Sequence, residues 1–201
     1  MIRHGKTSAN LTGVLDSLPP GLPLIEEGYL QAEKLAEALS GEPVVGVYAS
    51  RATRAQQTAA PIAGRHGLKV MVLGGVHEVQ LGDWEGSSDA ESLQGFLKTF
   101  ARWLEKDLDR RIPGGESARE VLGRFLSDVR AIHAGHARGG VAVLVSHGAA
   151  IRLASINMAD NLDVKTVDAR FIPNAEYVVM ESVSSSGESW RCLEWIGDKV
   201  D

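Results

Sequence analysis

Short apolar runs rich in β-branched residues alternate with amphipathic helical segments along this chain of 201 residues. Buried strands are predicted at residues 44–49, 69–73 and 141–145. Strands that alternate with helices pair in parallel and carry helices on both faces, so the pattern predicts a doubly wound α/β sheet. Ligands of such sheets bind at the carboxyl ends of the strands. Residues that directly follow a strand are therefore the first candidates for a functional site.

The segments between these strands repeat apolar residues at intervals of three and four, which is typical of amphipathic helices. We expect helices at residues 26–39, 51–64, about 93–108, 116–132 and 149–158. Ser50 is the expected N-cap of the second helix, which Pro61 would end or kink. Two C-terminal strands are expected at residues 176–180 and 190–195, joined by a Ser/Gly-rich turn over residues 184–189. The Gly and Pro residues between positions 11 and 24 predict a long loop.

The length predicts one domain over residues 1–201. The net charge of -5 opposes binding to nucleic acid or to an anionic membrane, so a bound anion would need local arginines. The single cysteine, Cys192, excludes an intramolecular disulfide and fits a reducing compartment. The sequence lacks both an apolar run of the ~18 residues that span a membrane and a signal-peptide core, which predicts a cytoplasmic protein.

A histidine followed by a glycine occurs twice at a strand end, at His4 near the N-terminus and at His147 after the third predicted strand. Glycine lets the backbone turn tightly and approach an anion, which a histidine in a packed core does not require. Arg3 precedes the first histidine, and Arg54 lies one helical turn beyond the end of the first predicted strand. Because arginine presents a planar set of donors that matches phosphate, these strand ends predict an anion site.

An acidic residue for the same pocket is available in the loop after residues 69–73. Glu78 and Glu85 both lie there, and either could be a proton donor. Two histidines, two arginines and one glutamate can neutralise a phosphoryl group and supply a proton. His133 and His136 have a spacing that suits a metal, but the sequence offers no evident third ligand, which favours a solvated helix end.

A succession of motifs along nearly the whole chain resembles the histidine phosphatase superfamily, the phosphoglycerate-mutase-like family. The matching segments are Arg3-His4-Gly5-x-Thr7-x-x-Asn10, Pro23-Leu24 with Gly28 and Gln31-Ala32, Ser50 to Thr58 with Arg54, Glu78 with Gly82 and Trp84-Glu85-Gly86, Pro113 to Ser117, and Ser146-His147-Gly148. Ile25 and Ala52 stand where the family usually has threonine and leucine. The resemblance implies a single-domain three-layer α/β/α sandwich with a mostly parallel sheet, here with a truncated first strand.

The resemblance also implies a phosphohistidine mechanism that needs no metal and no other cofactor. His4 would attack the phosphorus atom in line, while Arg3, Arg54 and His147 would hold the equatorial oxygens and stabilise the transition state. An attacking imidazole must be neutral, and cationic neighbours disfavour its protonation.

Other residues of the same motifs take supporting roles by resemblance. Glu78, favoured over Glu85 by its place in the motif, would protonate the leaving oxygen and then activate the hydrolytic water. Asn10 would add a neutral donor in the pocket. Thr7 and Gly148 are further expected phosphate- or substrate-binding residues.

Phosphatase and mutase members of the family share this pocket and differ in the group that receives the phosphoryl group. Cofactor-dependent mutases carry a longer insertion between the acid loop and the later Glu-Ser block, whereas the interval from Glu78 to Glu116 is short here. A more open site admits water, which favours a phosphatase acting on a small phosphorylated metabolite, with a phosphoglycerate mutase as the alternative. Specificity is expected from residues 11–24, residues 84–100, Arg102, Arg110 or Arg111. Homodimers are common in the family, and the sequence leaves the oligomeric state open.

An inactive relative that serves as a binding or scaffold module is a second alternative. Only Met1 and Ile2 precede Arg3, whereas family members deliver this loop from a longer strand in the middle of the sheet. Loss of a central strand would cost several kcal/mol of apolar burial and leave His4 poorly positioned. The full set of pocket residues argues against this alternative.

Overall fold

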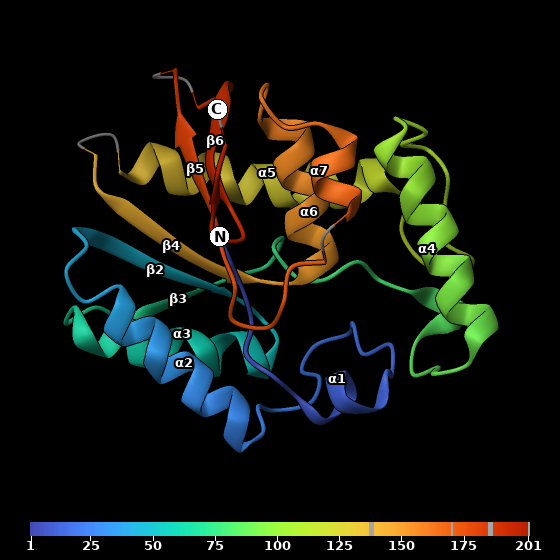
Figure 1. Ribbon diagram of the computed structural model, residues 1–201, viewed down its shortest axis with the longest axis horizontal. Coiled ribbons are helices and arrows are strands. Elements are labelled where there is room, and N and C mark those ends of the chain that lie inside the picture. Colours follow the sequence, from blue (N-terminus) through green and yellow to red (C-terminus); the bar gives the residue numbers. More distant parts are fainter. Residues whose placement is uncertain (137–138, 170, 185–186, 201) are drawn as a thin grey trace.

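A parallel sheet forms the middle layer of the molecule, as the computed structural model in Figure 1 shows. The structure describes residues 1–136, 139–169, 171–184 and 187–200. Its strands lie in the order β1 (Ile2–Arg3), β4 (Val141–Ser146), β2 (Val44–Ser50) and β3 (Val70–Leu73). All three pairings are parallel. A three-stranded antiparallel sheet follows, in the order β5 (Val178–Ser182), β6 (Trp190–Trp195) and β7 (Asp198–Lys199).

Helices cover both faces of the parallel sheet. Their bounds are α1 Ser8–Thr12, α2 Glu26–Ala38, α3 Thr53–Arg65, the 3-10 helix η1 Gly82–Trp84, α4 Ala90–Leu104, α5 Ala118–Gly135, α6 Gly148–Met158 and α7 Val164–Ala169. Helices α2 and α3 lie on one side of the sheet, and α5, α6 and α7 lie on the other (Figure 1). The predicted three-layer α/β/α fold is therefore confirmed.

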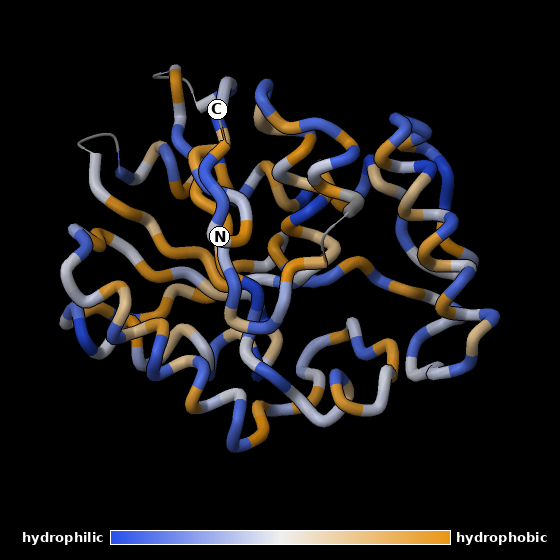
Figure 2. Tube along the Cα trace, viewed as in Figure 1, coloured by the Kyte–Doolittle hydropathy of each residue, from blue (hydrophilic) through white to orange (hydrophobic). Residues whose placement is uncertain are grey.

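Alternating residues of the central strands supply one apolar core on each face of the sheet. Val47 and Ala49 of β2 pack with the α2 and α3 side, whereas Tyr48, between them, packs with the α4, α5 and α6 side. Figure 2 shows apolar residues concentrated along these strands. Among the described residues, no helix has both the length and the hydropathy needed to cross a bilayer.

Several predicted boundaries need correction. The loop expected over residues 11–24 begins later than predicted, because the short helix α1 extends to Thr12. Ser50 does not cap α3, because Ala52 is the N-cap residue. Pro61 lies within α3, which continues to Arg65. The short elements η1, α7 and β7 were not predicted, and positions 185–186 of the expected Ser/Gly-rich turn lie outside the described residues.

Strand β1 has only two residues but is bonded along both edges. On one side Ile2 and Arg3 pair in parallel with Val145 and Ser146 of β4. On the other side Ile2 forms an antiparallel bridge with Tyr177, just before β5. The His4 amide then donates to the carbonyl oxygen of Ser146 at 3.0 Å. The short strand is thus an interior strand that delivers His4 to the carboxyl edge of the sheet.

Candidate active site

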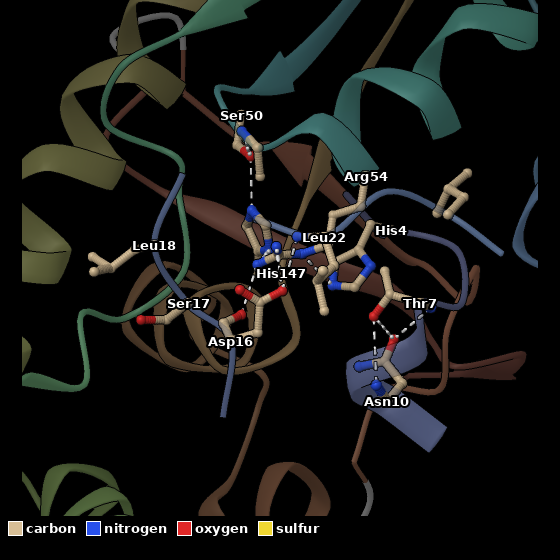
Figure 3. A network of polar contacts seen from close by, with 12 residues as sticks. His4, Thr7, Asn10, Asp16, Ser17, Leu18, Leu22, Ser50, Arg54 and His147 are labelled. Carbon is tan, nitrogen blue, oxygen red and sulfur yellow. Dashed lines mark hydrogen bonds and ion pairs between the residues drawn. The ribbon is translucent and has the colours of Figure 1, made fainter. Parts of the chain in front are cut away.

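His4 is buried where β1 ends, and its contacts define which ring nitrogen is available for chemistry. Nδ1 lies 2.7 Å from the carbonyl oxygen of Gly5, which can only accept, so Nδ1 carries the proton. Nε2 is then the lone-pair atom, and Nε of Arg54 donates to it at 3.2 Å (Figure 3). Burial, followed by the charges of Arg54 and Arg3, holds the pKa of His4 well below 6.5. The imidazole is therefore neutral at physiological pH, and Nε2 carries the lone pair that a nucleophile needs.

The loop after His4 is held by residues of α2 and α3. The Gly5 amide donates to Oγ1 of Thr58 in α3 at 2.9 Å, and the Lys6 amide donates to Oε1 of Gln31 in α2 at 2.9 Å. Gly28 of α2 packs so closely that a Cβ atom there would lie 2.2 Å from the Lys6 carbonyl oxygen. These contacts explain why the motif residues Gly28, Gln31 and Thr58 accompany His4 in the sequence.

Arg54 extends from the first turn of α3 into the pocket and is only 2% exposed. Its Nη2 lies 3.4 Å from Nδ1 of His147, so two of its nitrogens approach the two imidazoles. Its Nη1 forms a 3.2 Å ion pair with the carboxylate of Asp16, and Nη2 also donates to the Asp16 carbonyl oxygen at 2.9 Å. The loop between α1 and α2 thus anchors the arginine of the predicted phosphate site.

His147 is the N-cap residue of α6, directly after β4, and it is fully buried. Its ring centroid lies 5.1 Å from that of His4, so the two strand ends bring both histidines together. Its Nε2 lies 2.7 Å from Oγ of Ser50, at the end of the neighbouring strand β2. Burial and then the nearby His4 and Arg54 lower the pKa of His147 well below 6.5.

Arg3 lies beside the start of α6. Its Nη1 donates to the carbonyl oxygen of Ile172 at 2.6 Å, whereas its Nε is buried and has no hydrogen-bond partner within the described part of the chain. A Cβ atom at Gly148 would lie 3.4 Å from this Nε, so glycine lets the guanidinium approach the helix start. A buried donor without an acceptor is costly, and an anion bound here would satisfy it.

Glu78 lies at the N-terminus of α6, next to His147. Oε1 accepts from the amide of Ala150 at 2.9 Å, and Oε2 accepts from the amide of Ala149 at 3.2 Å. Unpaired amides and the helix dipole stabilise a carboxylate at such a position. The structure therefore places this acid beside the second histidine of the pocket.

Arg124 of α5 fixes the backbone that carries Glu78. It donates to the carbonyl oxygens of Gly75, His77 and Glu78 at 2.6, 2.8 and 2.9 Å. Its charge is balanced by Glu116, whose carboxylate lies 2.7 Å away. Sequence reasoning missed Arg124, because an arginine on an amphipathic helix normally indicates an exposed face.

The carboxylate of Glu85, the other candidate acid, is hydrogen-bonded to the loop between α1 and α2. Oε1 accepts from the amides of Ser17 and Leu18 at 2.8 and 3.2 Å, and Oε2 accepts from the Ser17 hydroxyl. Glu85 thus holds the same loop that carries Asp16. Both carboxylates accept hydrogen bonds, but Glu78 does so at the start of α6 next to His147, and this position favours Glu78 as the proton donor.

Thr7 and Asn10 form a capping box at the start of α1 (Figure 3). The Thr7 hydroxyl donates to Oδ1 of Asn10 and accepts from the Asn10 amide. Nδ2 of Asn174 also donates to Asn10 Oδ1, at 3.0 Å, and to the His4 carbonyl oxygen, at 3.1 Å. Within the Asn10 side chain these contacts use the oxygen Oδ1, so the side-chain nitrogen Nδ2 is the donor that can face a ligand. The contacts of Thr7 indicate that it shapes the loop.

Four other residues considered in the sequence analysis pack against or form ion pairs with side chains outside the proposed pocket. His136 contacts the Tyr48 hydroxyl at 2.7 Å, and the His133 ring packs edge-on against Trp190. Arg102 and Arg111, considered for specificity, form exposed ion pairs: Arg102 with Glu105 and Asp107, and Arg111 with Glu120. Sequence reasoning also gave no role to Asp16, although it lies in the loop expected to be functional.

Comparison with known protein families identifies the superfamily to which this fold and pocket belong. The sequence profile described as "Histidine phosphatase superfamily (branch 1)" matches residues 1–196. The chain belongs to the histidine phosphatase superfamily. This membership, together with full-length relatives that are named phosphatases, confirms the predicted enzyme class, a phosphoric monoester hydrolase of the histidine phosphatase type.

Individual relatives within the histidine phosphatase superfamily are named phosphatases. The chain is 32% identical to glucosyl-3-phosphoglycerate phosphatase of Mycobacterium tuberculosis (strain ATCC 25618 / H37Rv), over 97% of this chain and 90% of that protein. It is 32% identical to phosphoserine phosphatase 1 of Hydrogenobacter thermophilus, over 76% of this chain and 71% of that protein. A solved structure of mycobacterial glucosyl-3-phosphoglycerate phosphatase matches with a TM-score of 0.81 and 29% identity, covering 98% and 97% of the two chains. By contrast, the match to PE-PGRS family protein PE_PGRS11 of Mycobacterium tuberculosis covers only 15% of that relative.

Proposed function

We propose that this histidine phosphatase hydrolyses a small phosphomonoester through a phosphohistidine formed on Nε2 of His4. The observation that carries the proposal is the fixed, neutral state of His4, with Nδ1 bonded to Gly5 and Nε2 facing Arg54. A neutral imidazole nitrogen that carries a lone pair is the nucleophile that an in-line attack on phosphorus requires.

The groups around His4 supply the charge that the transition state needs. Arg54 and Arg3 are the cations. The Nε of Arg3 is buried and has no hydrogen-bond partner among the residues that the structure describes, which supports a role in holding an equatorial oxygen. His147 and the Asn10 amide would add neutral donors. Fixed donors in a buried site stabilise developing negative charge without reorganisation, so this set can serve the transfer without a metal ion.

Glu78 would act as the proton donor and then as the base. In the first half-reaction it would protonate the leaving oxygen, and in the second it would take a proton from the water that attacks the phosphohistidine. Its place at the start of α6, adjacent to His147, supports this role, as does the engagement of Glu85 with the Ser17 loop.

For the substrate we propose a phosphorylated sugar, sugar acid or amino acid, the classes named in glucosyl-3-phosphoglycerate phosphatase and phosphoserine phosphatase. Residues 1–201 would form one catalytic domain. The sequence has a single cysteine, Cys192, which is buried and free. A chain without an intramolecular disulfide fits a reducing compartment, which supports the proposed cytoplasmic location.

The test is phosphate release in EDTA from a panel that includes glucosyl-3-phosphoglycerate, phosphoserine and 3-phosphoglycerate, with the wild type and His4→Ala. We expect release by the wild type, none by the variant, and an acid-labile, base-stable phosphoenzyme in rapidly quenched samples. Retained hydrolysis in His4→Ala would overturn the assignment of the nucleophile. Isomerisation of phosphoglycerate in the presence of a bisphosphate, with no release, would indicate a mutase instead.

A further inference from the structure

Ser50 and His147 form a fully buried pair behind the proposed phosphate pocket. The Ser50 Oγ lies 2.7 Å from Nε2 of His147, and it also accepts from the Ala52 amide at 3.2 Å. The other ring nitrogen, Nδ1, lies 3.4 Å from Nη2 of Arg54 (Figure 3). The imidazole therefore lies between a hydroxyl, which can donate or accept, and a guanidinium, which can only donate.

These partners fix the tautomer of His147 when no anion is bound. A proton on Nδ1 would face the Arg54 donor, so Nδ1 keeps its lone pair and the proton is on Nε2. Nε2 then donates to Ser50 Oγ. Because that oxygen already accepts from Ala52, it acts in this state as a double acceptor, and its own proton is not used in the contact with the ring.

A phosphoryl oxygen bound between Arg54 Nη2 and His147 Nδ1 reverses these requirements. To hold that oxygen, His147 must donate from Nδ1, because Nε2 points at Ser50. Without an anion, burial and four neighbouring groups, His4, Arg54, His77 and Arg3, oppose a second proton on the ring. In the complex a neutral ring with its proton on Nδ1 satisfies both contacts, because the Ser50 hydroxyl can turn and donate to Nε2.

We propose that Ser50 is a positioning residue that switches the tautomer of His147 when the phosphoryl group binds. The Ser50 hydroxyl accepts from Nε2–H in the free enzyme and donates to Nε2 in the complex, where it still accepts from the Ala52 amide. The ring keeps a single proton throughout, since Nε2 loses one to solvent and Nδ1 gains one. This inference rests on the proposed function, because its ligand is the phosphoryl group in the same pocket.

The direct test is long-range proton–nitrogen NMR of ¹⁵N-histidine-labelled protein with and without saturating inorganic phosphate, with His147 assigned through His147→Asn. In the wild type we expect the proton on Nε2 without phosphate and on Nδ1 with it. In Ser50→Ala the buried Nε2 has no donor in the complex, so we expect phosphate affinity and kcat/KM to fall about 10- to 100-fold. Ser50→Thr, which keeps the hydroxyl, should restore the Nδ1 tautomer in the complex.

Ser146→Ala is the matched control. Ser146 is also a fully buried strand-end serine, but its hydroxyl donates to the Val76 carbonyl oxygen at 2.7 Å instead of to the ring. This variant should leave the His147 nitrogen shifts of the wild type in place, although it loses stability.

Three results would overturn the inference: protons on both ring nitrogens in the phosphate complex, no response of His147 to phosphate, or wild-type shifts and kcat/KM in Ser50→Ala. Failure of the proposed function has a different signature. In that case the wild type and His4→Ala would release equal amounts of phosphate, whatever the state of His147.

Discussion

The Asp16 carboxylate meets Nη1 of Arg54 at 3.2 Å, while Nε of the same guanidinium faces His4 at 3.2 Å. One arginine thus links the proposed nucleophile to the loop between α1 and α2. Glu85 fixes the neighbouring part of this loop through Ser17. A loop expected from the sequence to influence specificity therefore also orients a residue of the proposed catalytic pocket.

Replacing Asp16 should weaken catalysis because Arg54 loses the partner that fixes its orientation. For Asp16→Ala we expect kcat/KM to fall about 10- to 100-fold, the scale of a charge-assisted hydrogen bond. Steady-state kinetics on the best substrate of the panel measures the loss. Glu37→Ala removes a carboxylate from an exposed ion pair with Arg65 and should change kcat/KM by less than about twofold. Equal effects of the two variants would contradict the bracing role of Asp16.

Glu78→Gln and Glu85→Gln should separate the proton donor from the loop anchor. Glu78→Gln keeps an acceptor for the α6 amides but cannot donate a proton efficiently, so we expect kcat to fall about 10²- to 10⁴-fold on alkyl phosphates. The loss should shrink on p-nitrophenyl phosphate, whose leaving group needs no protonation. Glu85→Gln should raise KM without this dependence on the leaving group. A leaving-group dependence that appears in Glu85→Gln and is missing from Glu78→Gln would reverse the two assignments.

Arg124→Met should destabilise the protein and impair catalysis together. The substitution leaves Glu116 partly buried without its cation and frees three carbonyl oxygens of the loop that carries Glu78. We expect a loss of about 3 kcal/mol in the free energy of unfolding, measured in urea. Arg119→Met breaks an exposed ion pair with Asp109 and should cost less than about 1 kcal/mol. Comparable losses in both variants would mean that the Arg124 network contributes little.

The buried histidines His4 and His147 should make stability fall as the pH falls below about 6.5. His4 and His147 have their pKa lowered in the folded protein by burial and by neighbouring charges. Below the ordinary value of 6.5 the unfolded chain binds protons at these residues that the folded chain does not, so acid favours unfolding. Between pH 7 and 5.5 this linkage amounts to about 1 kcal/mol for each histidine. Urea unfolding at several pH values should show a shallower slope in the His4→Asn/His147→Asn double variant, and an unchanged slope would refute this cause.

The parts of the fold that could be predicted are those with a strong local pattern. Residues 141–145 are mostly β-branched and apolar, and α5 (Ala118–Gly135) lies close to the helix predicted at residues 116–132. Helix α1 has five residues and α7 has six, too few for a helical period to show. The strand-end histidines were visible because strand ends and glycines are local features. The contact of Asp16 with Arg54 was not, because it depends on how a Pro/Gly-rich loop folds back over a distant helix.

Strand β1, held between β4 and the residues before β5, also bears on how the enzyme is made. Ile2 and Arg3 cannot be fixed in place until both of these later segments have been synthesised. A nascent chain that stops after α6 would already contain His4, Arg54, Glu78 and His147, yet it would lack one wall of the strand that holds His4. The support of His4 is therefore completed only by residues around Tyr177, so a break in the chain between α6 and β5 would disturb His4 from a distance.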